Sequence, residues 1–200
     1  ANGTIEVLDG ARGRLLKTIS PCPEASGVVC APTEGLVFAA SRGSGKILAI
    51  NPTKNTVTRT VQAGTKPNGV AWDNDDDLLL VADIGDQHAR LVDPERGPVK
   101  TIKLPGRPRW CRYSTHLDKF VILIKDPAGY VTLDPRKGAL SPLVPVKAHG
   151  PHGIDLSADG REAYIACDAG VGVAMDLEKG AETCRAKILG EPDVVWHNAK

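Results

Sequence analysis

The sequence lacks a net charge of either sign. Its 200 residues contain 25 Lys and Arg against 24 Asp and Glu, so the formal net charge is +1. Proteins that bind nucleic acid carry surplus positive charge and often aromatic side chains, and aromatic residues make up only 4% of this chain. Arg107, Arg109 and Arg112 around Trp110 therefore predict packing and local ion pairs. A nucleic-acid partner is not expected.

Long hydrophobic runs are missing as well. No apolar stretch approaches the roughly 20 residues that a helix needs to cross a bilayer. Residues 1–9 contain neither the basic nor the apolar region of a signal peptide. We therefore expect a soluble chain without membrane contact. The remaining composition, with 42% hydrophobic and 24% charged residues, is that of a globular protein with a sizeable core.

Cysteine pairs at metal-site spacing are also absent. The five cysteines form no CxxC motif, and their odd number leaves at least one thiol without a partner in the chain. They are Cys22, Cys30, Cys111, Cys167 and Cys184. A zinc site and a disulfide framework are not expected, and the thiols are interpreted as small hydrophobic side chains. Free thiols favour a reducing, cytoplasmic compartment, although the sequence leaves the compartment open.

The chain does contain an internal repeat of about 42 residues. Five apolar segments each end on an Asp or Asn, and a Gly or Asn follows four residues later. The five anchors recur 42, 42, 41 and 42 residues apart: Asp9, Asn51, Asp93, Asp134 and Asp176. An Asp or Asn side chain can bond the backbone of its own turn, and Gly or Asn tolerates positive φ. Each anchor therefore predicts a hairpin turn.

A second series of anchors has the same period. It consists of a proline before a short apolar strand, at Pro67, Pro108, Pro151 and Pro192, with Ala25 as a degenerate copy. The intervening apolar runs, such as 78–82 and 120–124, are too short for helices. Each repeat therefore contains four strands, here called A to D. Strand A follows the proline anchor, B comes next, C ends on the Asp or Asn anchor, and D follows it. Four strands per repeat of this length predict an all-β, four-stranded-blade β-propeller, with about five blades visible.

The predicted repeats form a single β-propeller domain over residues 1–200. They are 4–45, 46–87, 88–128, 129–170 and the incomplete 171–200. The first strand, Thr4 to Asp9, is a C strand, and the last, Val194 to His197, is an A strand, so one B strand is missing between them. A missing strand leaves unpaired edges. We therefore expect a fragment of a six- or seven-bladed ring that can self-associate through cut blade edges.

Two segments carry a resemblance to known propellers. Asn2 to Asp9 and Pro67 to Trp72 resemble the YVTN-type β-propeller repeat, and the likeness extends over essentially the whole chain. Gluconolactonase-like propellers are similar around Pro67-Asn68-Gly69 and Val81-Ala82-Asp83. The resemblance implies the propeller fold. These families include binding proteins and enzymes, so it does not by itself imply a function.

The candidate site lies where loops of several repeats meet. In a propeller, the loops that enter strand A and those that join B to C share one face, at the mouth of the central channel. The loops that enter A supply the predicted ligand-binding residues Asn68, Arg109, His149 and Asp193, together with His152. The loops after B supply Asp83, Lys125 and Asp168, among others. Polar side chains that converge on one concave face are typical of a binding site.

The leading hypothesis is a non-enzymatic propeller that binds a small molecule or protein at the channel face, with no cofactor. The alternative is a metal-dependent hydrolase of lactone or ester type. For it, the gluconolactonase resemblance implies that Asn68 holds Ca²⁺ or Mg²⁺ together with carboxylates of other blades, which Asp83, Asp168 or Asp193 can supply, with Asn68, Asp83 and Asp168 as the predicted set. His152 is the candidate catalytic residue that moves protons. Propellers of the virginiamycin-lyase type are similar in placing a catalytic His here, but this sequence shows no acidic residue in a matching motif.

Overall fold

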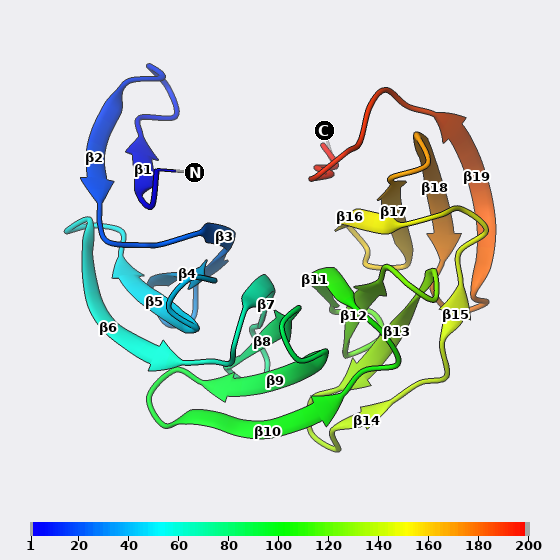
Figure 1. The fold of residues 1–200 in the computed structure, drawn as a ribbon, viewed down its shortest axis with the longest axis horizontal. Helices are drawn as coiled ribbons and strands as arrows, with labels where there is room; N and C mark the ends of the chain where they lie inside the picture. The colour runs from blue at the N-terminus through cyan, green and yellow to red at the C-terminus, as the bar shows by residue number, and fades with distance from the viewer. Residues whose placement is uncertain (1, 199–200) are drawn as a thin grey trace. The chain divides into compact units, whose positions relative to one another are not determined.

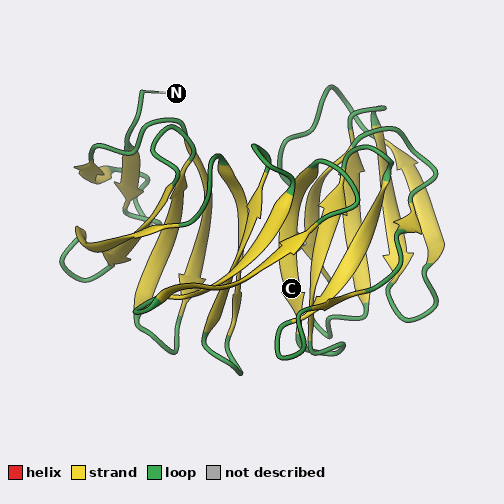
Figure 2. Ribbon diagram, turned by 60° about the horizontal axis from the view of Figure 1, so that its bottom comes forward, coloured by secondary structure: helices red, strands yellow, loops and turns green. Residues whose placement is uncertain are grey.

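The computed structural model describes residues 2–198. The described residues form strands joined by turns and loops, without a helix (Figure 2). None of them therefore forms a helix that could span a membrane. The chain divides into two compact units, Ala1–Thr101 and Ile102–Lys200, and each is described by itself. The all-β prediction is confirmed.

Unit 1 contains one two-stranded sheet and one four-stranded sheet, and a second four-stranded sheet ends at the border of the units (Figure 1). Within each sheet the strands follow one another in chain order. The strands are β1 (Ile5–Leu8), β2 (Leu15–Ile19), β3 (Ala25–Ala31), β4 (Leu36–Ser41), β5 (Lys46–Asn51), β6 (Thr56–Gln62), β7 (Pro67–Asp73), β8 (Leu78–Asp83), β9 (His88–Asp93) and β10 (Gly97–Lys103).

Unit 2 contains two sheets of the same order, β11 to β14, with β15 also paired to β13, and β16 to β19. The strands are β11 (Pro108–Ser114), β12 (Lys119–Ile124), β13 (Gly129–Asp134), β14 (Ala139–Leu140), β15 (Val144–Pro145), β16 (Pro151–Leu156), β17 (Glu162–Cys167), β18 (Val171–Asp176) and β19 (Ala181–Lys187). Chain-order antiparallel sheets of four strands are the blades of a propeller.

The predicted hairpin turns are confirmed. Asn51 Oδ1, for example, accepts hydrogen bonds from the backbone N–H groups of Thr53 (3.0 Å) and Lys54 (2.9 Å), and Asn55 has a φ of 52°. The other four anchors accept from their own turns in the same way: Asp9, Asp93, Asp134 and Asp176. These local bonds explain why the anchor type recurs in every repeat.

Each unit buries its own apolar cores. In unit 1, one core packs β4, β5, β7 and β8 around Phe38, Ile47 and Trp72, and the Phe38 and Trp72 rings are stacked with centroids 5.5 Å apart. A second core joins β1 and β2 to β4 and β5. In unit 2, a third core packs side chains of β12 and β13 against β16, β17 and β18. Adjacent sheets in each unit therefore stack face to face through apolar side chains.

All five cysteines are free, as expected. Three are buried (Cys22, Cys111 and Cys167), and two are exposed (Cys30 and Cys184). Burial raises the pKa of Cys111 to about 12 and that of Cys167 to about 11. Both buried thiols therefore stay protonated at neutral pH and pack as hydrophobic groups.

Two details differ from the prediction. The expected D strand of repeat 129–170 is split into β14 and β15, with Pro142 between them, because proline has no N–H to donate to a ladder. The expected A strand at Val194–His197 is not a strand. Strands are defined by their ladder partners, and no strand of residues 2–198 pairs with this segment. The prediction of a strand here was therefore wrong.

A close approach of two strands in unit 1 gives the first prediction. A Cβ added at Gly27 of β3 would lie 2.5 Å from the Asn68 carbonyl oxygen of β7, so Gly27→Ala must push the two sheets apart. We expect it to lower the free energy of unfolding by about 1–3 kcal/mol, the usual range for overpacking, as measured by urea denaturation. The control is Gly10→Ala, which has nothing within 4 Å. Equal effects of the two variants would contradict the close approach.

Candidate functional site

A bulge aims one side chain per repeat away from the sheet. The ladder of strands A and B shifts register just after its first pair, between Pro67 and Gly69 in one repeat and between Pro151 and Gly153 in another. The same shift occurs near the start of β3 and of β11. A bulge re-aims the residue that it leaves out of the ladder. That residue is Asn68 in unit 1 and His152 in unit 2.

His152 lies at the centre of a charged group in unit 2, here called the His152 cluster: Lys125, His152, Asp168 and Asp193. Its Nδ1 lies 2.8 Å from Asp168 Oδ1, and its Nε2 lies 3.0 Å from Asp193 Oδ1. The second oxygen of Asp168 accepts from Lys125 Nζ at 2.6 Å. The side chains of His152 and Asp168 are mostly buried, whereas that of Asp193 is 78% exposed. Asp193 is therefore the member that solvent or a ligand can displace.

Two backbone contacts place Asp168 beside the imidazole. The Asp168 N–H donates to Gly150 O at 2.9 Å, and the Ala169 N–H donates to His149 O at 3.2 Å. Gly150 has a φ of 66°, and a Cβ there would lie 2.7 Å from Asp168 Oδ2. Both its backbone conformation and the lack of space thus require glycine. Residues 149–153 therefore contribute to the cluster through their backbone as well as through the imidazole of His152.

The charge on Asp168 is held by its neighbours. Burial alone would raise the pKa of its carboxyl, but the hydrogen bonds from Lys125 and His152 and the charges of both groups outweigh that effect. The pKa of Asp168 therefore lies below its usual value. The His152 ring thus lies between two carboxylates: its Nδ1 is hydrogen-bonded to Asp168 Oδ1, and its Nε2 lies beside Asp193 Oδ1.

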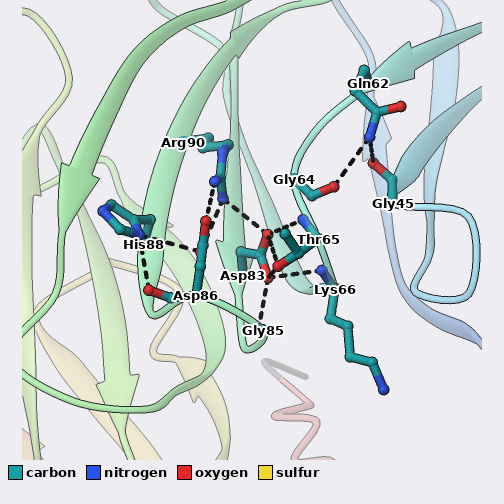
Figure 3. Close-up of polar contacts among 10 residues, drawn as sticks. All are labelled: Gly45, Gln62, Gly64, Thr65, Lys66, Asp83, Gly85, Asp86, His88 and Arg90. Atoms are coloured by element: carbon teal, nitrogen blue, oxygen red, sulfur yellow. Dashed lines mark hydrogen bonds and ion pairs between the residues drawn. The ribbon is translucent and has the colours of Figure 1, made fainter.

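Asp83, a predicted site residue in unit 1, has other contacts than Asp168 has in unit 2 (Figure 3). Its fully buried carboxylate accepts from the backbone N–H groups of Thr65 (2.5 Å), Lys66 (2.9 Å) and Gly85 (2.8 Å), and from Arg90 Nη1 (2.9 Å). Three backbone donors and a guanidinium satisfy both of its oxygens. Asp83 thus fastens the loop that enters β7 to the loop that leaves β8.

Arg90 also reaches a second carboxylate in this unit. It pairs with Asp86, and His88 Nδ1 lies 3.2 Å from the other Asp86 oxygen. Burial alone would raise the pKa of Asp86, but the hydrogen bond and charge of Arg90, with a smaller contribution from His88, lower it. Asp86, in the loop after β8, therefore contacts Arg90 on one side and His88 on the other, as Figure 3 shows.

The structure brings together some of the predicted site residues. His152 meets Asp168 and Asp193, and the equivalent position in unit 1, Asn68, accepts a hydrogen bond from Ser26 Oγ at 3.1 Å. The residue one position after the start of an A segment thus contacts its counterpart in the next A segment in both units: Ser26 contacts Asn68, and His152 contacts Asp193. Arg109 is half-buried, and His149 is exposed and contributes its carbonyl. The acidic partner of His152 and its link to Lys125 were missed in the sequence. The sequence signal that could have revealed this link is the opposite charge of Lys125 and Asp168, each of which directly follows the B strand of its own sheet.

The metal hypothesis finds no ready site among the described side chains. Residues 2–198 contain no group of three His, Cys, Asp or Glu side chains placed to hold a metal ion. Asn68 is 4% exposed, and the carboxylates of Asp83 and Asp168 are both occupied by protein donors. The predicted set of Asn68, Asp83 and Asp168 combines residues of the two units, and it remains a prediction.

The buried carboxylate in unit 1 leads to a stability prediction. Asp83→Asn replaces one acceptor oxygen by a donor and leaves Arg90 without its buried counter-charge. We expect the free energy of unfolding to fall by roughly 3 kcal/mol, as when one partner of a buried ion pair is removed. Asp93→Asn is the control, because Asn51 occupies the equivalent turn position. Urea denaturation would contradict the prediction if both variants were equally stable.

The charge on Asp168 leads to a pH prediction. Because its folded pKa is lowered, the stabilisation by Asp168 is present above the pKa of an unfolded aspartate, about 3.9. It is lost as the pH falls through the lower folded pKa. Lys125→Met should raise the pKa of Asp168, as followed by carboxyl NMR. It should also reduce stability at neutral pH by up to about 1 kcal/mol. A pKa unchanged in the variant would show that the pair is not formed.

The fold, but no family, can be assigned by comparison. No family model and no curated protein matches the chain. Among solved structures, hydrazine synthase of Kuenenia stuttgartiensis aligns with a TM-score of 0.77 at 17% identity, over 91% of this chain and 53% of its own. Virginiamycin B lyase of Staphylococcus aureus aligns at 0.80 and 14%, over 96% and 67%. The β-propeller domain of Myceliophteria thermophila Cps50 (Swd1) aligns at 0.69 and 12%, over 84% and 58%.

The chain thus spans about half the length of the first of these structures. At such identities the likeness supports the architecture and nothing finer. By fold, the chain is a β-propeller of four-stranded antiparallel blades.

Proposed function

We propose that this β-propeller is a non-enzymatic binding protein that holds a small molecule at the His152 cluster. The observation that carries the proposal is the position of Asp193. Its exposed carboxylate lies against Nε2 of a mostly buried imidazole, whose other nitrogen is fixed by Asp168. An exposed side chain is easily exchanged for a ligand group of the same chemistry. The cluster therefore offers a preformed place beside Nε2 to an incoming ligand group.

The charges indicate which ligand group fits. Without Asp193, the cluster presents Nε2 of His152 and the ammonium of Lys125 beside one mostly buried carboxylate, Asp168. A carboxylate on the ligand can take the place 3.0 Å from Nε2 that the Asp193 carboxylate occupies. Small carboxylates are thus the favoured ligand class.

Several features favour binding over catalysis. A catalytic imidazole activates a nucleophile or the substrate through a ring nitrogen within hydrogen-bond reach. Within residues 2–198, the recorded polar contacts of the His152 ring are with carboxylates only. The neighbouring thiol of Cys167 has its pKa raised to about 11 by burial, so it is a poor nucleophile. The solved neighbours include proteins named as enzymes and one named only as a propeller domain, and the fold serves both.

The test measures the binding of acetate, succinate and gluconate by isothermal titration calorimetry. We expect Asp193→Ala to tighten binding, because it removes the competing carboxylate, and His152→Gln to weaken it about tenfold, or 1.4 kcal/mol. The control is Asp159→Ala, an exposed carboxylate in the turn between β16 and β17. Circular dichroism checks that each variant folds.

Two outcomes would overturn the proposal. Carboxylate binding that is the same in all three variants would place the ligand elsewhere. A gain in melting temperature with Ca²⁺ or Mg²⁺, together with hydrolysis of a lactone or ester that His152→Gln abolishes, would instead establish the metal-dependent hydrolase.

A further inference from the structure

The residue directly after each B strand is held in the same way in the four sheets that contain an A and a B strand. Its backbone N–H donates to the carbonyl oxygen of the residue directly before the A strand of that sheet, at between 2.8 and 3.3 Å. The four donors, in chain order, are Arg42, Ile84, Lys125 and Asp168. One backbone hydrogen bond thus fixes this position in both units, and only its side chain differs.

In unit 2, this position places a cation beside a carboxylate. Lys125 follows the B strand of one sheet, and Asp168 follows the B strand of the next sheet along the chain. Asp168 accepts from Lys125 Nζ at 2.6 Å, and its other oxygen lies 2.8 Å from His152 Nδ1. The carboxylate is therefore held between a cation of the first sheet and the bulge residue of the second sheet.

Unit 1 has the cation but not the carboxylate. Arg42 is at the position of Lys125, whereas the next sheet has Ile84 at the position of Asp168. The two sheets concerned, β3 to β6 and β7 to β10, are consecutive in the chain, as their counterparts in unit 2 are. An isoleucine side chain has no acceptor. The repeat therefore gives Arg42 an apolar neighbour in sequence position where Lys125 has a counter-charge.

The Arg42 side chain has no other partner in the described part of the chain. Within residues 2–198 its guanidinium forms no hydrogen bond or ion pair, and its Nε is buried. The residue as a whole is half-buried. A buried donor without an acceptor is unfavourable, and the cost is larger for a charged group. An anion that reaches Arg42 from solvent would relieve it.

Asn68 supplies a second donor at the position of His152. It is the residue that the bulge of β7 leaves out of the ladder, and only 4% of it is exposed. Its Oδ1 accepts from Ser26 Oγ at 3.1 Å. Its Nδ2, which carries two N–H donors, has no acceptor among residues 2–198. Unit 1 thus has an unused donor at each of the two positions that hold the Asp168 carboxylate in unit 2.

The carboxylates near these donors have other partners. The Glu24 carbonyl accepts from the Arg42 N–H at 3.3 Å, but the Glu24 carboxylate lies 4.0 Å from Lys66 Nζ. Asp83 precedes Ile84, and both of its oxygens accept from backbone N–H groups and Arg90. Neither carboxylate contacts the Arg42 guanidinium. Its positive charge is therefore available to a ligand.

We propose that unit 1 binds the carboxylate of a small molecule between Arg42 and Asn68, in the place that the Asp168 carboxylate takes in unit 2. The planar guanidinium of Arg42 donates to the carboxylate, and Asn68 Nδ2 donates to its second oxygen. We call this the Arg42 site. It shares no residue with the His152 cluster, so it is a second binding site and does not depend on the proposed function.

The test follows the side-chain N–H signals of Arg42 and Asn68 by ¹⁵N NMR while acetate is added at constant ionic strength. We expect both signals to shift with one Kd. Arg42→Gln should weaken the response of Asn68 about tenfold, or 1.4 kcal/mol. The matched control is Arg96→Gln, because the Arg96 side chain is 84% exposed in a turn of unit 1. It should leave the Kd unchanged, and so should His152→Gln.

A second variant supplies the carboxylate within the chain. Ile84→Asp places an aspartate at the position that Asp168 has in unit 2, where it should pair with Arg42 and abolish the response of Asn68 to acetate. Ile84→Asn has the same shape without the charge and should keep that response. Circular dichroism checks that both variants fold, and Ile84→Asp should melt no lower than Ile84→Asn.

Four results would overturn the proposal. The Asn68 signals could stay unchanged at saturating acetate, or Arg96→Gln could weaken the response as much as Arg42→Gln, which would show attraction by general charge. Loss of the response in His152→Gln would assign the acetate to the His152 cluster instead. A response to inorganic phosphate but not to acetate would contradict the assignment to carboxylates.

Discussion

The ladder between strands A and B of each four-stranded sheet slips by one residue soon after it begins, and the candidate site depends on this slip. Pro67 pairs with Asp83 and Pro151 with Cys167, and pairing resumes at Gly69 and Gly153. The residue passed over is excluded from the ladder, and its side chain leaves the plane of the sheet. Because the slip recurs with the repeat, the same position is freed in each copy. His152 and Asn68 owe their contacts to it.

Backbone contacts at the same end of the sheets determine which residues lie beside the side chains of Asn68 and His152. In unit 1, the Asp83 carboxylate accepts hydrogen bonds from three backbone N–H groups and from Arg90. In unit 2, Cys167 stands at the position equivalent to Asp83, and the carboxylate comes one residue later, at Asp168. That shift turns the carboxylate toward His152 and Lys125. One end of the repeat thus fastens a loop in unit 1 and forms a charged cluster in unit 2.

The proposed function rests on one exposed side chain. In the His152 cluster, the carboxylate of Asp193 stands where a ligand carboxylate can bind. Asp193 lies in segment 192–197, which packs against β16 at Gly153 and has no ladder partner there among residues 2–198, but donates from the His197 N–H to Asp155 Oδ2 at 2.7 Å.

The sequence by itself determined the period, the strands and the turns. These features depend on residues near one another in the chain, such as Asn51 and the two N–H groups of its own turn, so each repeat carries its own signal. The tertiary structure decided the rest. Which carboxylate meets His152 depends on a glycine at 150 that lets the backbone of Asp168 approach. Segment 194–197 has the composition of a strand, yet a strand exists only with a partner, and pairing is a property of two segments rather than one.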